Sequence, residues 1–478
     1  MTWTTFRTCE EELALLCGIS NLLHWDRAVL MPAAGVEQRA LQCGLMSRMY
    51  HERLTSDELK REIRTLRAKT PIQQAILERY AWKMGRAEKL PKEHVEELST
   101  LTARAEQAWE KAKQKKDFRI FKPFLERIIS LKQKEAALID KHKHPYEVLL
   151  DEYERGMTLA ELDIIFARLK RELIPLIRTY AGKKRIITSD VQAQKTITQD
   201  IATRILDTKE RFLIALSAHP FTTTLGPDDI RITTAFKHDP TFAFLSTAHE
   251  AGHALYEGGF GKDLKNTILA DAPSLGMHES QSRFWENIIC KGMPFWHFYY
   301  DFFSKELQLS ISHEQFYKRL ITVQPSLIRI EADEVTYCMH IIIRYEIEKA
   351  LIEGSLSVKD IPRAWNDKYK TYLGITPKHD AEGCLQDVHW SQGAFGYFPT
   401  YALGSIYAAM LYRALLREHP QLEKDISKGD FSFIKQWLAK KIHRHGAMFL
   451  AKDLMRAACG KALDVQDFIT YLHRKCAP

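Results

Sequence analysis

Two histidines and a glutamate in one short stretch of the chain have the spacing of a metal centre with a general base. Residues 242–259 are FAFLSTAHEAGHALYEGG, in which His249 and His253 are four residues apart and Glu250 follows the first histidine. On an α-helix, residues four apart lie on one face, so both imidazoles can reach one ion about 2.0 Å from each nitrogen. Glu250 lies about 100° round the helix from His249 and can instead take a proton from a water molecule. The pattern predicts a metal site, and two core histidines bonded to neighbouring groups are the alternative.

A third ligand must come from elsewhere in the chain, because a catalytic zinc site has three protein ligands and one open position. The run after His253 continues ALYEGGFGK without another histidine, so a later carboxylate is required. The segment 277–289, MHESQSRFWENII, offers two, since a helix from Ser274 to about residue 290 would place Glu279 and Glu286 on one stripe with Arg283.

Glu279 is the first candidate for this ligand. It follows His253 by enough residues for a loop and a returning helix, while Glu286 is the reserve candidate and Asp271 the third. A salt-bridged helix face is the alternative interpretation of the stripe.

The flanking residues predict the helix on which the two histidines must stand. Asp239 and Pro240 supply an N-cap and a first-turn proline, and Gly258 and Gly259 offer a C-terminal stop. Apolar or small residues recur on one side between them. We therefore expect a helix of about 18 residues with a half-buried face.

The composition of the whole chain is typical of a mainly α globular protein with little β structure. The 478 residues are 45% hydrophobic and 27% charged, with only 22 Gly and 17 Pro, and apolar residues repeat at helical spacing. The one clear strand signal is DIRITT, residues 229–234, where β-branched residues alternate.

No linker or internal repeat divides the chain, so we expect one catalytic unit with two parts. Residues 1–145 hold long charged helical patterns and are predicted to form an N-terminal helical subdomain that makes a wall or lid of a cleft. Residues 146–478 are more apolar, hold every candidate site residue, and are predicted to form a catalytic helical region with the metal site.

The charge pattern and the cysteines restrict the partners and the compartment. The net charge is +8, but Lys and Arg alternate with Glu as on a solvated helix face, so we expect no nucleic-acid partner. Glu11 and Glu12 stand where a signal peptide would be apolar, and we expect neither a secretion signal nor a membrane span. The eight cysteines form no C-x-x-C pair, which is typical of reduced thiols in the cytoplasm.

Five motifs in order resemble the carboxypeptidase Taq family of zinc metallocarboxypeptidases. In chain order they are DIRIT at 229–233, HEAGHALYEGG at 249–259, HESQSRFWEN at 278–287, IRIEADE at 328–334 and GCLQDVHW at 383–390. The resemblance extends through WDRAVLMP near the N-terminus and FGYFPTYALGSIYAAML near residue 400, so it covers most of the chain.

The resemblance implies a large helical fold with a deep central cleft, similar to angiotensin-converting enzyme and neurolysin. It implies a homodimer that removes single residues from the C-termini of peptides, with broad specificity, and one divalent metal ion per chain held by His249, His253 and Glu279. Zinc is the expected ion, and cobalt suits the same ligands. By the same analogy His389, Tyr401 and Tyr397 are the candidate donors to the reacting carbonyl oxygen, although each can equally be a hydrogen-bonded core residue.

A carboxypeptidase must also bind the free carboxylate of its substrate, which a planar guanidinium does with two parallel hydrogen bonds. Arg329 is our first candidate, on a helix expected to begin about Ser326, and Arg231 is the second. Either arginine can pair with an internal acid instead, such as Asp333 for Arg329, and for Arg231 we favour that interpretation.

Two other functions remain open at this point. A zinc oligopeptidase that cuts inside short peptides would use the same centre without the carboxylate site, and a helical binding protein could retain a silent metal site.

Overall fold

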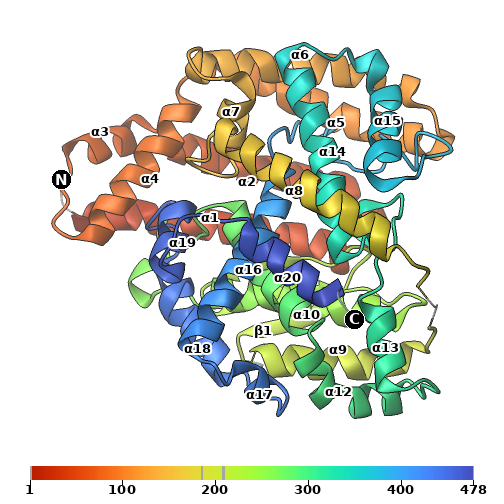
Figure 1. The fold of residues 1–478 in the computed structure, drawn as a ribbon. Coiled ribbons are helices and arrows are strands. Elements are labelled where there is room, and N and C mark those ends of the chain that lie inside the picture. Colours follow the sequence, from red (N-terminus) through yellow and green to blue (C-terminus); the bar gives the residue numbers. More distant parts are fainter. Residues whose placement is uncertain (1–2, 185–186, 207–209, 477–478) are drawn as a thin grey trace.

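Helices dominate the structure, a computed structural model that describes residues 3–184, 187–206 and 210–476 (Figure 1). The mainly α fold with little β structure, predicted from the composition, is confirmed. The helices before the sheet are α1 (Trp3–Val29), α2 (Val36–Leu54), α3 (Asp57–Thr65), α4 (Pro71–Ala87), α5 (Lys92–Lys115), α6 (Lys122–Asp140), α7 (Pro145–Leu150), α8 (Leu159–Tyr180) and α9 (Val191–Leu206).

A small sheet interrupts the helices just before the metal motif. Strands β1 (Phe212–Leu216), β2 (Thr222–Gly226) and β3 (Asp229–Thr234) lie in the order β1-β3-β2. The central strand β3 pairs parallel with β1 and antiparallel with β2. The strand predicted at 229–234 is therefore confirmed, and the other two strands were not predicted.

The chain returns to helices after the sheet. These are α10 (Pro240–Gly258), α11 (Leu275–Arg283), α12 (Met293–Glu306), α13 (His313–Leu320), α14 (Glu334–Glu353), α15 (Ile361–Leu373), α16 (Pro399–Glu418), α17 (Leu422–Ile426), α18 (Ser432–Lys441), α19 (Ala451–Cys459) and α20 (Gln466–Cys476). Helix α11 continues into a π-helical turn, Phe284–Ile289, of the kind that often occurs at functional sites. In the described part of the chain, no helix is both long and apolar enough to cross a membrane.

The buried apolar side chains form one large cluster and one small cluster. The large cluster runs from Ala105 to Leu472 and includes the helices of the metal motif. The small cluster joins residues between Phe6 and Met84 with Leu264, Leu269 and Ala447. Helices α5 and α6 thus contribute to the large cluster although they precede residue 145. The division at 145, the lid and the deep cleft stay predictions.

Candidate metal centre

Helix α10 carries the H-E-x-x-H pattern and has the start and stop expected of it. The Asp239 side chain accepts a hydrogen bond from the backbone N–H of Thr241, Pro240 occupies the first turn, and the helix ends at Gly258. Helix α11 is capped by Ser274, whose side chain accepts from the backbone N–H of Met277. Both caps agree with the sequence-based expectations.

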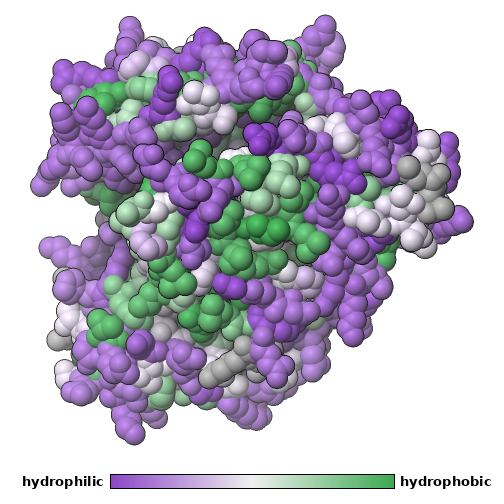
Figure 2. All heavy atoms as spheres, turned by 180° about the vertical axis from the view of Figure 1, so that it is seen from behind, coloured by the Kyte–Doolittle hydropathy of each residue, from purple (hydrophilic) through white to green (hydrophobic). Residues whose placement is uncertain are grey.

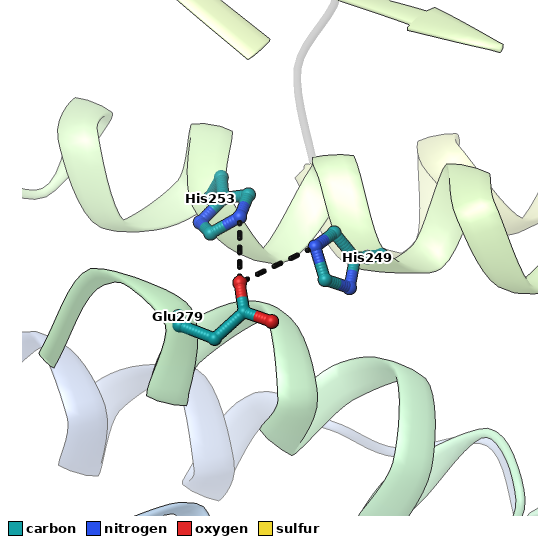
Figure 3. A group of neighbouring side chains, drawn as sticks. All are labelled: His249, His253 and Glu279. Atoms are coloured by element: carbon teal, nitrogen blue, oxygen red, sulfur yellow. Dashed lines mark ion pairs between the residues drawn. The ribbon is translucent and has the colours of Figure 1, made fainter. Parts of the chain in front are cut away.

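Three donor atoms converge between α10 and α11 (Figure 3). The Nε2 atoms of His249 and His253 each lie 3.6 Å from Oε2 of Glu279. One ligand atom from each of these three residues lies within 4.8 Å of the other two. Two imidazole nitrogens and a carboxylate oxygen at this separation fit a divalent metal ion.

The charges around the cluster favour a cation and keep the carboxylate ionised. Burial works against ionisation of Glu279, but the adjacent Arg283 and His249 hold its pKa well below the usual value. Burial also works against protonation of His249, yet Glu279 and Glu286 together raise its pKa. The two carboxylates therefore create a negative potential around the His249 ring.

His249 is oriented by a carboxylate behind it. Its Nδ1 lies 2.8 Å from Oε2 of Glu286, so Nε2 is left to face Glu279. Arg283 links the two carboxylates, with Nε donating to Glu279 over 2.7 Å and Nη1 donating to Glu286 over 3.4 Å. Lys291 lies 3.5 Å from the other oxygen of Glu286. Glu286, the reserve ligand candidate, therefore contacts the other nitrogen of His249 and is not one of the three converging residues.

His253 is oriented by stacking instead. Its ring lies parallel to that of His278, with centroids 4.2 Å apart, and its Nδ1 is buried without a hydrogen-bond partner among the described residues. His278 is fixed by Glu257, whose Oε1 is 2.8 Å from its Nε2, and Thr224 of β2 donates to the other Glu257 oxygen. Burial, with a further contribution from His278, lowers the pKa of His253 to about 3, so this ring stays neutral, as a ligand must.

Two glycines allow α11 to lie very close to its neighbours. A Cβ at Gly252 of α10 would be 2.6 Å from the carbonyl oxygen of Gln281, and a Cβ at Gly404 of α16 would be 2.6 Å from Cγ of Glu279. Neither distance is compatible with a side chain unless a helix moves. Glycine on both sides therefore sets the depth at which Glu279 enters the cluster.

Glu250 lies next to the donor cluster on the same helix and is held by the sheet. Thr222 of β2 donates from its hydroxyl to Oε2 of Glu250 over 2.7 Å. Burial raises the pKa of Glu250, while His249 and the Thr222 hydroxyl oppose this shift. A carboxylate with a raised pKa suits a group that accepts a proton and later returns it.

His389, Tyr397 and Tyr401 form a second group of neighbouring side chains. Nε2 of His389 is 3.3 Å from the hydroxyl of Tyr401, and the two tyrosine rings have centroids 5.4 Å apart. Burial lowers the pKa of His389 to about 4, so this imidazole is neutral near pH 7. Burial raises the pKa of both phenols, and the Glu279 carboxylate adds to the shift of each.

The structure corrects the expected surroundings of Arg329. Helix α14 begins at Glu334 rather than near Ser326, because Asp333 caps it by accepting from the backbone N–H groups of Val335 and Thr336. Arg329 precedes the helix in a short 3₁₀ turn and does not pair with Asp333.

Arg329 pairs instead with Asp387 of the GCLQDVHW segment. Its Nε and Nη2 lie 3.0 and 2.9 Å from Oδ1 of Asp387, and its Nη1 donates to the hydroxyl of Tyr337 over 3.2 Å. Its guanidinium also lies 4.9 Å from the centre of the Tyr401 ring. Asp387 holds the fully buried Arg344 through its other oxygen, at 2.6 Å. Asp387 and Arg344 were not predicted from the sequence. Asp387 lies within GCLQDVHW, whereas Arg344 of α14 lies outside the motifs quoted above.

Arg231 makes the internal pair that was favoured for it. Its Nη2 is 2.7 Å and its Nε 2.8 Å from the two carboxylate oxygens of Asp229, and its guanidinium lies 4.5 Å from the centre of the Trp25 ring. Asp271, the third ligand candidate, lies apart from the cluster and pairs with Arg79 at 3.2 Å. Thr222, Glu257 and His278 were not predicted, although Glu257 lies within HEAGHALYEGG and His278 is the first residue of HESQSRFWEN.

Known proteins resemble this chain over almost its whole length. A family model described as carboxypeptidase Taq (M32) metallopeptidase matches residues 5–476. The chain is 39% identical to carboxypeptidase 1 of Bacillus subtilis, over 95% of this chain and 94% of that protein. It is 36% identical to thermostable carboxypeptidase 1 of Thermus thermophilus, over 98% of this chain and 97% of that protein. The crystal structure of the M32 carboxypeptidase from Deinococcus radiodurans R1 matches with a TM-score of 0.96 at 33% identity, covering 99% of this chain and 98% of that one.

Proposed function

Because this chain belongs to the carboxypeptidase Taq (M32) metallopeptidase family, we propose that it is a metal-dependent carboxypeptidase that releases single amino acids from the C-termini of peptides. The observation that carries the proposal is the convergence of His249, His253 and Glu279 beside Glu250. The oligopeptidase alternative is not favoured, because the matched relatives are named carboxypeptidases.

In this proposal the three converging residues hold one divalent ion and Glu250 moves the proton. A bound divalent cation lowers the pKa of water and polarises the scissile carbonyl. Glu250 takes the proton from the attacking water and returns it to the leaving amine, and its burial and raised pKa support both steps. Thr222 holds the Glu250 carboxylate in place between these transfers.

The remaining candidates have positions that suit substrate binding. The neutral His389 imidazole and the Tyr401 and Tyr397 hydroxyls are proposed donors to the oxygen of the scissile carbonyl as negative charge develops on it. Arg329 is the proposed partner of the substrate carboxylate, because it lies against Tyr401 and Asp387 fixes its plane. Arg231 is the second choice, because its guanidinium lies against Asp229 and Trp25, whereas that of Arg329 lies against Tyr401.

Several finer points belong to the same proposal. We propose zinc as the native ion, with cobalt as a functional substitute, because both suit a His-His-Glu set. We further propose broad side-chain specificity, a cytoplasmic location, and a homodimer. Residues 1–145 are proposed to act as a wall or lid over the substrate.

Product masses from a set of peptides test the function directly. The metal-loaded protein should shorten peptides with free C-termini one residue at a time and should leave C-terminally amidated copies largely intact. Internal fragments from both kinds of peptide would instead identify an oligopeptidase, and no hydrolysis by the loaded protein would identify a binding protein.

A further inference from the structure

Helix α20 carries a buried lysine that the proposed reaction does not use. Charged side chains normally lie in solvent, and hydrophilic residues cover most of the periphery of the face that Figure 2 shows. The side chain of Lys475 is instead only 8% exposed. Lysines are almost never buried unless their charge is paired, so the contacts of Lys475 indicate what it holds in place.

The Lys475 ammonium contacts three polar groups. Its Nζ lies 2.6 Å from Oε2 of Glu334, the first residue of α14. It donates to the hydroxyl of Tyr471, one turn earlier on α20, over 2.7 Å. It also donates to the backbone carbonyl of Asn287 over 2.9 Å, and the Tyr471 hydroxyl donates to the same carbonyl over 3.0 Å. Two side chains of α20 therefore converge on one carbonyl oxygen.

This carbonyl belongs to the π-helical turn Phe284–Ile289 that follows α11. The last four carbonyls of a helix have no partner within the helix, and Asn287 is one of the last four residues of this turn. A positive side chain at this position also offsets the negative end of the helix dipole. Tyr471 and Lys475 thus cap the C-terminal end of the π-helical turn.

The capped turn carries a carboxylate that contacts a candidate metal ligand. Glu286 directly precedes Asn287, and its Oε2 lies 2.8 Å from Nδ1 of His249. Lys291 joins the two residues of the turn, with Nζ 2.8 Å from Oδ1 of Asn287 and 3.5 Å from Oε1 of Glu286. The direction of the Glu286 side chain depends on the position of its backbone, and α20 holds that backbone at the next residue.

We propose that Tyr471 and Lys475 are positioning residues for the metal centre, which hold Glu286 against His249 through the Asn287 carbonyl. A group that fixes the ring of a metal-ligating histidine raises metal affinity. Residues that hold this group in turn should contribute to the affinity without touching the ion or the substrate. The inference rests on the proposed function, because it takes His249 as a ligand.

Competition with a chromogenic zinc chelator tests the Tyr471 contact. Tyr471→Phe removes one hydroxyl and keeps the ring, so the fold should persist. Loss of one hydrogen bond to the turn should weaken zinc binding about 2- to 10-fold. This loss should be smaller than the effect of Glu286→Gln, which removes the carboxylate that contacts the histidine itself. An unchanged zinc affinity would overturn the role of Tyr471.

The Lys475 contact is tested by replacing the buried ion pair as a unit, because removing one member would leave a buried charge unpaired. Lys475→Met with Glu334→Gln removes the second donor to the Asn287 carbonyl and should weaken zinc binding at least as much as Tyr471→Phe does. An unchanged zinc affinity in this double variant would overturn the role of Lys475.

A buried pair on α6 provides the matched control. Nζ of Lys132 is also 2.6 Å from the Glu135 carboxylate, and the two side chains are 5% and 6% exposed. Lys132→Met with Glu135→Gln should therefore change the melting temperature of the metal-free protein about as much as the double variant on α20 and α14. Its zinc affinity should stay unchanged, and an equal loss of zinc affinity in this control would mean that α20 acts only through general stability.

A double-mutant cycle identifies the route. If Tyr471 acts through Glu286, Tyr471→Phe should weaken zinc binding in the unchanged protein and have little further effect in the Glu286→Gln protein. Equal losses in both backgrounds would overturn the route through Glu286. An unchanged protein that binds no zinc would overturn the metal centre as well, whereas a zinc affinity that no substitution in α20 changes would overturn the positioning role alone.

Discussion

Replacing Glu279 or Glu286 by glutamine should affect metal binding to very different degrees. Both carboxylates lie on the same helical segment and both contact His249, but only Glu279 has an oxygen that faces both Nε2 atoms. Glutamine keeps the shape of either side chain and removes its charge. The two variants therefore separate a ligand from a residue that orients a ligand.

The expected magnitudes follow from these contacts. Residues that hydrogen-bond a metal-ligating histidine typically contribute 10- to 100-fold in metal affinity, so Glu286→Gln should cost about 1.4 to 2.7 kcal/mol. Zinc sites bind with about 10 to 16 kcal/mol, which over three ligands is about 3 to 5 kcal/mol each, so Glu279→Gln should cost roughly 10²- to 10⁴-fold. Glu279→Gln also leaves the half-buried Arg283 with Glu286 as its remaining acid at 3.4 Å.

Competition with a chromogenic zinc chelator measures both affinities, and elemental analysis after dialysis gives the stoichiometry. Glu314→Gln is the matched control, because Glu314 is exposed and pairs with Lys318 within α13. Thermal melting of the metal-free proteins checks that the fold is intact. If Glu279→Gln bound one ion per chain with unchanged affinity while Glu286→Gln lost it, the ligand assignment would be wrong.

Four further outcomes are expected. Glu250→Gln should retain the metal while turnover falls about 10²- to 10⁴-fold, and near-normal kcat in metal-replete protein would contradict its role as the base. Arg329→Ala should lower kcat/KM about 30- to 5000-fold for peptides with a free C-terminus, and it should not lower it further for C-terminally amidated peptides, which lack the same contact. If the variant still preferred free over amidated peptides as the unchanged protein does, the carboxylate site would lie elsewhere. His278→Ala should weaken zinc binding about 10-fold in the chelator assay, and His278→Phe, which keeps a ring against the ligand, should recover part of it. Burial raises the pKa of the Glu348 carboxyl on α14 from 4.5 to about 7, so the folded state holds its proton more tightly and its contribution to the free energy of unfolding should fall by about 3 kcal/mol from pH 4.5 to 7; the difference between the unchanged protein and Glu348→Gln in urea unfolding at the two pH values measures it.

The parts of the site that the sequence could predict depend on local spacing. His249, His253 and Glu250 belong to one helix with its own cap and stop, so helical periodicity alone brings them together. The same holds for Glu279 and Arg283 after the Ser274 cap. The mainly α class likewise follows from composition and repeated apolar spacing.

The parts that could not be predicted depend on contacts between distant segments. Asp387 lies 58 residues from Arg329 and reaches it only after folding. Glu257 and His278 are 21 residues apart on two helices, and no spacing rule relates them. The start of α14 was misplaced because IRIE resembles a helix, whereas the Asp333 cap imposes a later beginning. Strands β1 and β2 are five residues each and too short for a clear periodic signal.

The glycines beside α11 limit how this centre could be transferred to another protein. A designer who copied His249, His253, Glu250 and Glu279 onto two facing helices of ordinary composition would obtain helices separated by the width of their side chains. Here Gly252 removes that spacing on one side, since even one methyl group would meet the backbone of residue 281 at 2.6 Å. A carboxylate grafted without such a contact would stop short of the imidazoles, so the second variable position of H-E-x-x-H must be specified together with the ligands.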